Sequence, residues 1–172
     1  LIIDFGIKEA SNYKRRLDLN TGIHQVSFDA DATYYTRETF VSHPDQVLLM
    51  KFKSSGKNKM NISLSFNSLL SHKVEAELGA FLISKNRLQM KGIAPSVAEP
   101  NYRGNIKDAV QYDSTKSMRF IADAGIYQTD GKIKTFGDKL IVDGATEIIL
   151  FVSLATSFNG FDKNPALQGK DE

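Results

Sequence analysis

The alternation of apolar and polar residues between positions 60 and 67 constrains the fold more than any other feature of the chain. Even positions are apolar and odd positions are polar: Met60, Ile62, Leu64 and Phe66 against Asn61, Ser63, Ser65 and Asn67. A period of two places each set on its own face of a strand. A helix would scatter the same apolar residues around its circumference. The pattern therefore predicts a half-buried antiparallel strand.

Turn residues recur at short intervals on both sides of this segment. Residues 20–22 (NTG), 29–31 (DAD), 43–45 (HPD) and 54–57 (SSGK) contain residues that tolerate turn dihedrals. No stretch of ten or more residues has helical periodicity. Short strands at this spacing predict an all-β, antiparallel β-sandwich. We expect strands at residues 1–5, 15–19, 23–28, 33–41, 46–53, 60–67, 78–84, 88–92, 118–124, 132–135, 140–142 and 148–152.

The segment IILFV at residues 148–152 is apolar at every position. A strand that is covered on both faces has this pattern, whereas a half-exposed strand alternates. We therefore expect residues 148–152 to form an inner strand of the sandwich.

Two stretches interrupt the regular spacing of strands, residues 93–112 and residues 157–172, both rich in Gly, Pro and polar side chains. Loops of this length are functional or disordered more often than structural. We predict a β-sandwich domain over residues 1–156 and a loop or linker over residues 157–172. The chain opens directly on the strand-like LIIDF, without a signal peptide. We interpret this opening as that of a mature form or a piece of a larger enzyme.

Composition excludes several classes of partner. The chain has 22 basic and 20 acidic residues and a formal net charge of +2. This balance gives no electrostatic reason to expect a nucleic acid or an anionic membrane as partner. No apolar run is long enough to span a bilayer. The absence of cysteine excludes disulfides and thiolate metal sites.

Metal ligands are sparse. His24, His43 and His72 lack a second ligand at the spacing of a zinc site. Asp29 and Asp31 offer two carboxylates in a turn, but the pattern of a calcium-binding EF-hand is missing. We predict no metal and no cofactor, and calcium binding at Asp29 and Asp31 stays open.

Catalytic motifs are equally weak. Ser54 and Lys57 match the pattern S-x-x-K, but on a predicted turn and not on the helix that this chemistry uses. Glu75 and Glu77 would lie on one face of a strand, roughly 6.5–7 Å apart. That separation is near the range of inverting glycosidases, yet an exposed acidic pair beside Lys73 favours a surface role. We predict no catalytic residue in this chain, and a self-contained hydrolase is the least favoured function.

Three segments, taken in order, resemble one family. They are NYKRRLDLNTG at residues 12–22, YTRETFVSHPDQV at residues 35–47 and ATSFNGFD at residues 155–162. Together they are similar to the N-terminal β-domain of glycoside hydrolase family 95, the α-L-fucosidase family. The resemblance implies a super-sandwich, which in full-length members pairs with an (α/α)6 barrel. Members have further strands before the segment that matches Leu1, so the resemblance implies a sandwich that lacks its first strands. The unpaired edge would favour self-association.

The resemblance also implies a function. The parent would be an inverting α-L-fucosidase that acts on fucosylated glycans, with its catalytic residues in the barrel. This chain would pack against the barrel as a non-catalytic domain. Whether the substrate is a fucoside or a galactoside stays open. For a polysaccharide-degrading bacterium, the resemblance suggests export to the periplasm, the cell surface or the medium.

The two long loops are the candidates for the rim of the parent's substrate pocket or for a domain interface, with solvent-exposed connections as the other interpretation. The candidate residues are Asn101, Tyr102, Arg103, Phe158, Asn159, Phe161 and Asp162. The alternative function is an independent carbohydrate-binding module, in which the exposed loop aromatics would stack on sugars.

Overall fold

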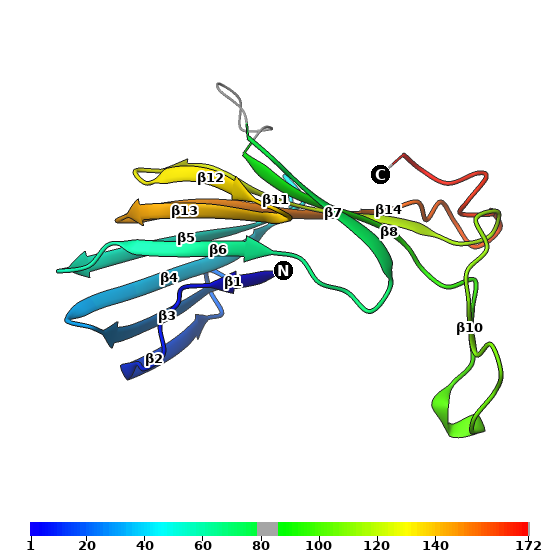
Figure 1. Ribbon diagram of the computed structural model, residues 1–172, viewed down its shortest axis with the longest axis horizontal. Helices are drawn as coiled ribbons and strands as arrows, with labels where there is room; N and C mark the ends of the chain where they lie inside the picture. Colours follow the sequence, from blue (N-terminus) through cyan, green and yellow to red (C-terminus); the bar gives the residue numbers. More distant parts are fainter. Residues whose placement is uncertain (79–85, 172) are drawn as a thin grey trace. The chain divides into compact units, whose positions relative to one another are not determined.

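The computed structural model describes residues 1–78 and 86–171, and in this part of the chain nearly all regular structure is β (Figure 1). Within the described residues, a 3-10 turn, η2, spans Asn101–Arg103. The strands are β1 (Ile2–Asp4), β2 (Ser11–Asp18), β3 (Ile23–Ala30), β4 (Thr33–Ser42), β5 (Val47–Gly56), β6 (Met60–Ser65), β7 (Ser71–Glu77), β8 (Arg87–Ile93), β9 (Val97–Ala98), β10 (Val110–Gln111), β11 (Arg119–Thr129), β12 (Lys132–Phe136), β13 (Lys139–Ala145) and β14 (Glu147–Thr156).

The strands form three sheets. The large sheet has eight strands in the order β2-β3-β4-β5-β14-β11-β8-β7, and the small sheet has four in the order β1-β6-β13-β12. Strands β9 and β10 form a separate antiparallel pair. The prediction of an all-β, antiparallel sandwich is confirmed.

The chain divides into two compact units. The first consists of residues 1–67, 75–89 and 123–153, and the second of residues 68–74, 90–122 and 154–172. Strands β7, β8, β11 and β14 contribute residues to both units.

The first unit contains the sandwich core, which forms between the small sheet and strands of the large one. Ile62 and Leu64 of β6 are at most 2% exposed and stand opposite Val142 and Leu140 of β13. From the large sheet, Phe52 (1% exposed) lies in the core, and its ring centroid is 5.3 Å from that of Phe5, which follows β1. The even-numbered face of residues 60–66 is therefore buried, as the alternation predicts.

Two differences from the sequence-based expectation concern the middle of the chain. Residues 71–77 form strand β7, of which the sequence analysis expects only the part at Glu75 and Glu77, and only its His72, Val74 and Ala76 positions are half-buried. The strand expected at residues 78–84 lies outside the described residues, apart from Leu78. Within residues 93–112, the short β9–β10 pair flanks the 3-10 turn.

Candidate functional site

Several carboxylates of the described residues form ion pairs with neighbouring basic side chains. Within residues 1–78 and 86–171, no three His, Asp or Glu side chains gather closely enough to hold a metal ion. Glu75 and Glu77 are exposed on β7, and Glu77 forms an ion pair with Arg87 Nε at 3.4 Å. No helix in the described part of the chain is long and apolar enough to cross a membrane.

Hydrogen bonds lower the pKa of several carboxyl groups among the described residues. Hydrogen bonds from the Thr146 hydroxyl and the Glu147 and Thr146 backbone N–H groups lower the pKa of Asp130 to about 2. Hydrogen bonds from Thr115 and then Lys116 lower the pKa of Asp113. A general acid for glycoside hydrolysis needs a raised pKa, so these two groups are unsuited to that step.

The candidate residues of the first predicted loop, Asn101–Arg103, form the 3-10 turn η2. Tyr102 is 85% exposed, and Arg103 forms an ion pair with Glu99 one turn earlier. Asn101 accepts a hydrogen bond from the backbone N–H of Gly104. The turn therefore presents an aromatic ring to solvent on a locally braced backbone.

The second predicted loop follows β14 and is anchored by its own polar groups. Phe158 and Phe161 contact each other edge-on, with ring centroids 5.1 Å apart, and Phe161 is fully exposed. Asn159 Nδ2 donates to the carbonyl of Gln168 at 2.9 Å. Asp162 is exposed. Among the described residues, no hydrogen bond, ion pair or ring contact joins this loop to η2, and the rim role of both stays a prediction.

Ser157 fixes the start of the second loop. It is fully buried, its hydroxyl accepts the Arg119 N–H at 2.9 Å, and its own N–H donates to the Arg119 carbonyl. Its carbonyl accepts the N–H of Lys170. Further along, Asn164 Nδ2 donates to the carbonyl of Thr115 at 2.8 Å. Residues 157–170 thus lie on the second unit, while the predicted domain boundary at residue 156 stays a prediction.

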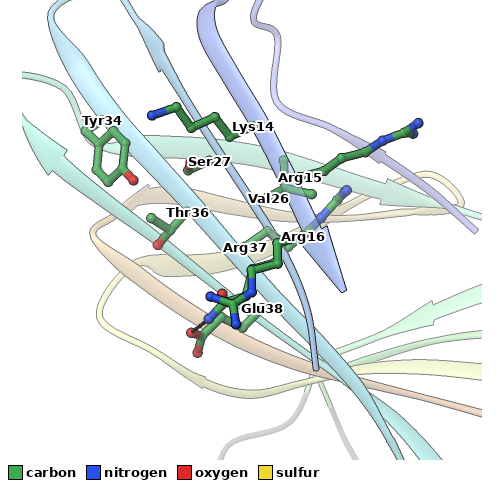
Figure 2. Close-up of a pocket in the computed structure, with 10 residues that line it drawn as sticks. Lys14, Arg15, Arg16, Val26, Ser27, Tyr34, Thr36, Arg37 and Glu38 are labelled. Carbon is green, nitrogen blue, oxygen red and sulfur yellow. Dashed lines mark hydrogen bonds between the residues drawn. The ribbon is translucent and has the colours of Figure 1, made fainter. Parts of the chain in front are cut away.

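The first unit has a polar hollow of about 510 Å³ over β2, β3 and β4 (Figure 2). Strand register builds it in two rows, Lys14–Ser27–Thr36 and Arg16–Gln25–Glu38. Gln25 Nε2 donates to Glu38 Oε1 at 3.0 Å, and Tyr34, which is 47% exposed, lies at the other end of the hollow, nearer Thr36 (Figure 2). The hollow thus offers hydroxyl, amide and cationic groups and one aromatic ring. Its lining residues are Lys14, Arg15, Arg16, Gln25, Val26, Ser27, Tyr34, Thr36, Arg37 and Glu38.

Beside the polar hollow, the same unit has a larger apolar groove of about 730 Å³. The sequence analysis does not predict it. Three charged side chains, Glu38, Asp45 and Lys51, contribute to its lining. The other lining side chains come from five strands and are apolar or aromatic: Ile23, Phe40, Val47, Leu49, Met50, Tyr127, Ile149 and Phe151. We call this surface the apolar groove.

Cross-strand pairing builds the floor of the apolar groove. Leu49 of β5 stands directly opposite Phe40 of β4 on one side and Phe151 of β14 on the other. Opposite residues in antiparallel strands share a face, so the three side chains form one row. A Cβ atom at Gly125 of β11 would lie 2.5 Å from the Phe151 ring. The glycine therefore leaves the space that this ring occupies.

Ion pairs border the apolar groove at the next paired residues along β5 and β14, beyond Leu49 and Phe151. Lys51, opposite Ile149, and Lys53, opposite Glu147, both reach the Glu147 carboxylate, at 3.3 and 3.2 Å. Hydrogen bonds from Lys53 and then Lys51 lower the pKa of Glu147. The polar border keeps Glu147 charged and marks where the apolar surface ends.

Curated relatives of the chain are fucosidases. The chain is 29% identical over 154 residues to Alpha-L-fucosidase 2 from Arabidopsis thaliana, a match that covers 87% of this chain and 18% of the relative. It is 34% identical over 65 residues to a Probable alpha-fucosidase A from Aspergillus oryzae, covering 38% of this chain and 9% of the relative. The chain thus spans less than a fifth of the length of these relatives.

Among solved structures, a putative kojibiose phosphorylase from the human microbiome matches with a TM-score of 0.46 and 14% identity. The match covers 91% of this chain and 21% of that chain.

A family model described as "Glycosyl hydrolase family 65, N-terminal domain" matches residues 1–160. The sequence resemblance names family 95, whereas the matching model describes family 65. The two agree on an N-terminal β-domain of a glycoside hydrolase. With nearly the whole chain matched, this protein belongs to the family of glycosyl hydrolase family 65 N-terminal domains.

Proposed function

We propose that the chain is the non-catalytic N-terminal β-domain of an α-L-fucosidase of the family 95 type, which packs against and supports a helical-barrel catalytic domain in the same polypeptide. The observation that carries the proposal is the family match over residues 1–160. The fucosidase names of the curated relatives support the choice of substrate.

The proposal includes the parent's chemistry and location. The parent would release fucose from fucosylated glycans with inversion, and it would be exported by a polysaccharide-degrading bacterium. The loops around Tyr102 and Phe161 would lie at the pocket rim or at the interface with the catalytic domain.

The first test is hydrolysis of an aryl α-L-fucoside and of 2′-fucosyllactose by the full-length protein and by residues 1–172 alone. We expect activity in the full-length protein only. Activity in residues 1–172 would refute the non-catalytic role, and an inactive full-length protein would refute the fucosidase assignment. An aryl α-L-galactoside serves as the alternative substrate in the same assay.

A second candidate function is carbohydrate binding at the polar hollow. The observation that favours it is the exposed Tyr34, which lies near Thr36 in the hollow that Ser27 and the amide of Gln25 also line (Figure 2). Sugars bind to such combinations of a ring face and hydrogen-bonding groups. The test is retention on affinity gels that contain fucosylated polysaccharide, with a Tyr34→Ala variant. Equal migration of both proteins with and without the polysaccharide would rule this candidate out.

Self-association through a sheet edge belongs to the same proposal. Among the described residues, strand β1 pairs with Ser63–Ser65 of β6 and with no other strand, so part of that edge of the small sheet is open. At the edge of the large sheet, Lys14, Arg15 and Arg16 of β2 place like charges that oppose edge pairing. We therefore expect any self-association at β1, and a monomer at all concentrations in sedimentation velocity would refute it.

A further inference from the structure

We propose that the apolar groove is the surface on which the catalytic domain of the same polypeptide docks. The inference rests on the proposed function and deepens it, because it names the face that the partner covers. The partner surface is correspondingly apolar at its centre and polar at its edge.

The first argument is the exposure of large apolar side chains in one place. Phe40 is 41% exposed and Tyr127 is 55% exposed, and Leu49, Ile149 and Phe151 between them are only half-buried. Single exposed apolar residues are ordinary, but a contiguous group of them marks an interaction surface.

The second argument is the sequence of the strands that carry the groove. In β14, Ile148 and Leu150 are fully buried on one face, yet Ile149 and Phe151 on the other face are also apolar. The segment VLLM at the start of β5 likewise fails to alternate. Strands of this kind are covered on both faces. One face is already buried in the core, so full burial of the second face would need a partner.

The third argument is the border of the groove. Glu38, Asp45 and Lys51 lie at its edge, and Lys51 shares the carboxylate of Glu147 with Lys53. Protein interfaces combine an apolar centre with a polar rim in this way. The groove therefore has the composition of a protein interface.

The remaining part of the polypeptide is the occupant that these observations favour. The chain corresponds to 18% of the length of Alpha-L-fucosidase 2, so about four-fifths of such a protein lies outside it. A glycan would need hydrogen-bonding groups on the floor, where Leu49, Ile149 and Phe151 offer none from their side chains. Those groups lie instead in the polar hollow.

Hydroxyl-radical footprinting of the full-length protein tests the proposal without relying on activity. Tyr127 and Phe40 are compared with Tyr13 and Phe136, which are 57% and 74% exposed and lie away from the groove. After correction for intrinsic reactivity, we expect oxidation of Tyr127 and Phe40 to be about fivefold or more below that of the two controls, because an interface centre excludes water. Equal oxidation of all four residues would overturn the proposal.

Charged variants of the full-length protein test whether the contact matters. Phe40→Glu and Tyr127→Glu change exposed side chains, so both should fold, and Phe136→Glu is the matched control on β12. We expect the groove variants to raise the rate of trypsin cleavage between the domains by about tenfold. The control should leave this rate unchanged. Groove variants that behave like the control would count against docking.

The outcomes separate this inference from the function on which it rests. Protection of Phe40 and Tyr127 in a full-length protein without fucosidase activity would sustain the docking surface and refute the fucosidase assignment. An active enzyme with both residues fully reactive would refute only the docking surface. Protection that disappears on dilution would replace the catalytic domain with a second copy, and protection that needs added oligosaccharide would replace it with a glycan.

Discussion

Replacement of Ser157 by Ala should release the segment that carries Phe158, Phe161 and the other residues of the second candidate loop. The Ser157 hydroxyl accepts the Arg119 N–H at 2.9 Å in a fully buried position. The alanine keeps the two backbone hydrogen bonds that Ser157 makes with Arg119 and Lys170. The loss is therefore one hydrogen bond of three, about 1–2 kcal/mol.

Trypsin cleavage after Lys163 provides the assay, because Asn164 donates to the Thr115 carbonyl and we expect the bond to be cleaved faster when the segment opens. If cleavage follows the open population, a change of 1–2 kcal/mol should raise its rate by about 5–30-fold. Ser153→Ala in β14 is the matched control, since it makes the same chemical change outside this network. Equal cleavage of the two variants would show that the hydroxyl does not hold the segment, and the reasoning would be wrong.

Two further substitutions test the electrostatics and the core of the first unit. The pKa of Asp130 is lowered to about 2 by hydrogen bonds, first from Thr146. Its folded pKa thus lies below the unfolded value, so the stability it contributes is complete above about pH 4 and is lost as the pH falls towards 2. Asp130→Asn should therefore destabilise the protein by about 1 kcal/mol at pH 7 and very little near pH 2, a difference that urea denaturation at both pH values would reveal. Leu64→Ala should cost about 2–5 kcal/mol in the same assay, because Leu64 is fully buried opposite Leu140. Ser63→Ala on the other face should cost under about 0.5 kcal/mol, and similar costs for the two would contradict the assigned faces.

The sequence predicts the fold well where one face of a strand is strongly apolar. Residues 60–66 alternate between large apolar and polar side chains, and the structure buries Met60, Ile62 and Leu64 as expected. Strand β7 is predicted only in part because its inward positions are His72, Val74 and Ala76. Only one of these is strongly apolar, so the period of two is hardly visible in its sequence.

The apolar groove could not be predicted from the sequence, although one sign of it was present. Phe40, Leu49 and Phe151 become neighbours only through the pairing of β4, β5 and β14. Such register is a tertiary property, and a slip of one residue would move every side chain to the other face. The sign was the apolar run at residues 148–152. It predicts coverage of both faces, and in this structure Ile149 and Phe151 are only half-buried.

That difference links the fold to the proposed role. Ile148 and Leu150 are already fully buried, so the first face of β14 needs no further partner. The second face exposes apolar surface that burial in an interface would stabilise, and the proposed catalytic domain, linked in the same polypeptide, would be present at a high effective concentration. That domain would bind only the folded form of the β-domain. Its docking would therefore raise the free energy of unfolding of the β-domain. Docking at the apolar groove and the stability of the β-domain should then be coupled in the full-length protein. Variants of Phe40 should weaken the docking and lower the free energy of unfolding of the β-domain together.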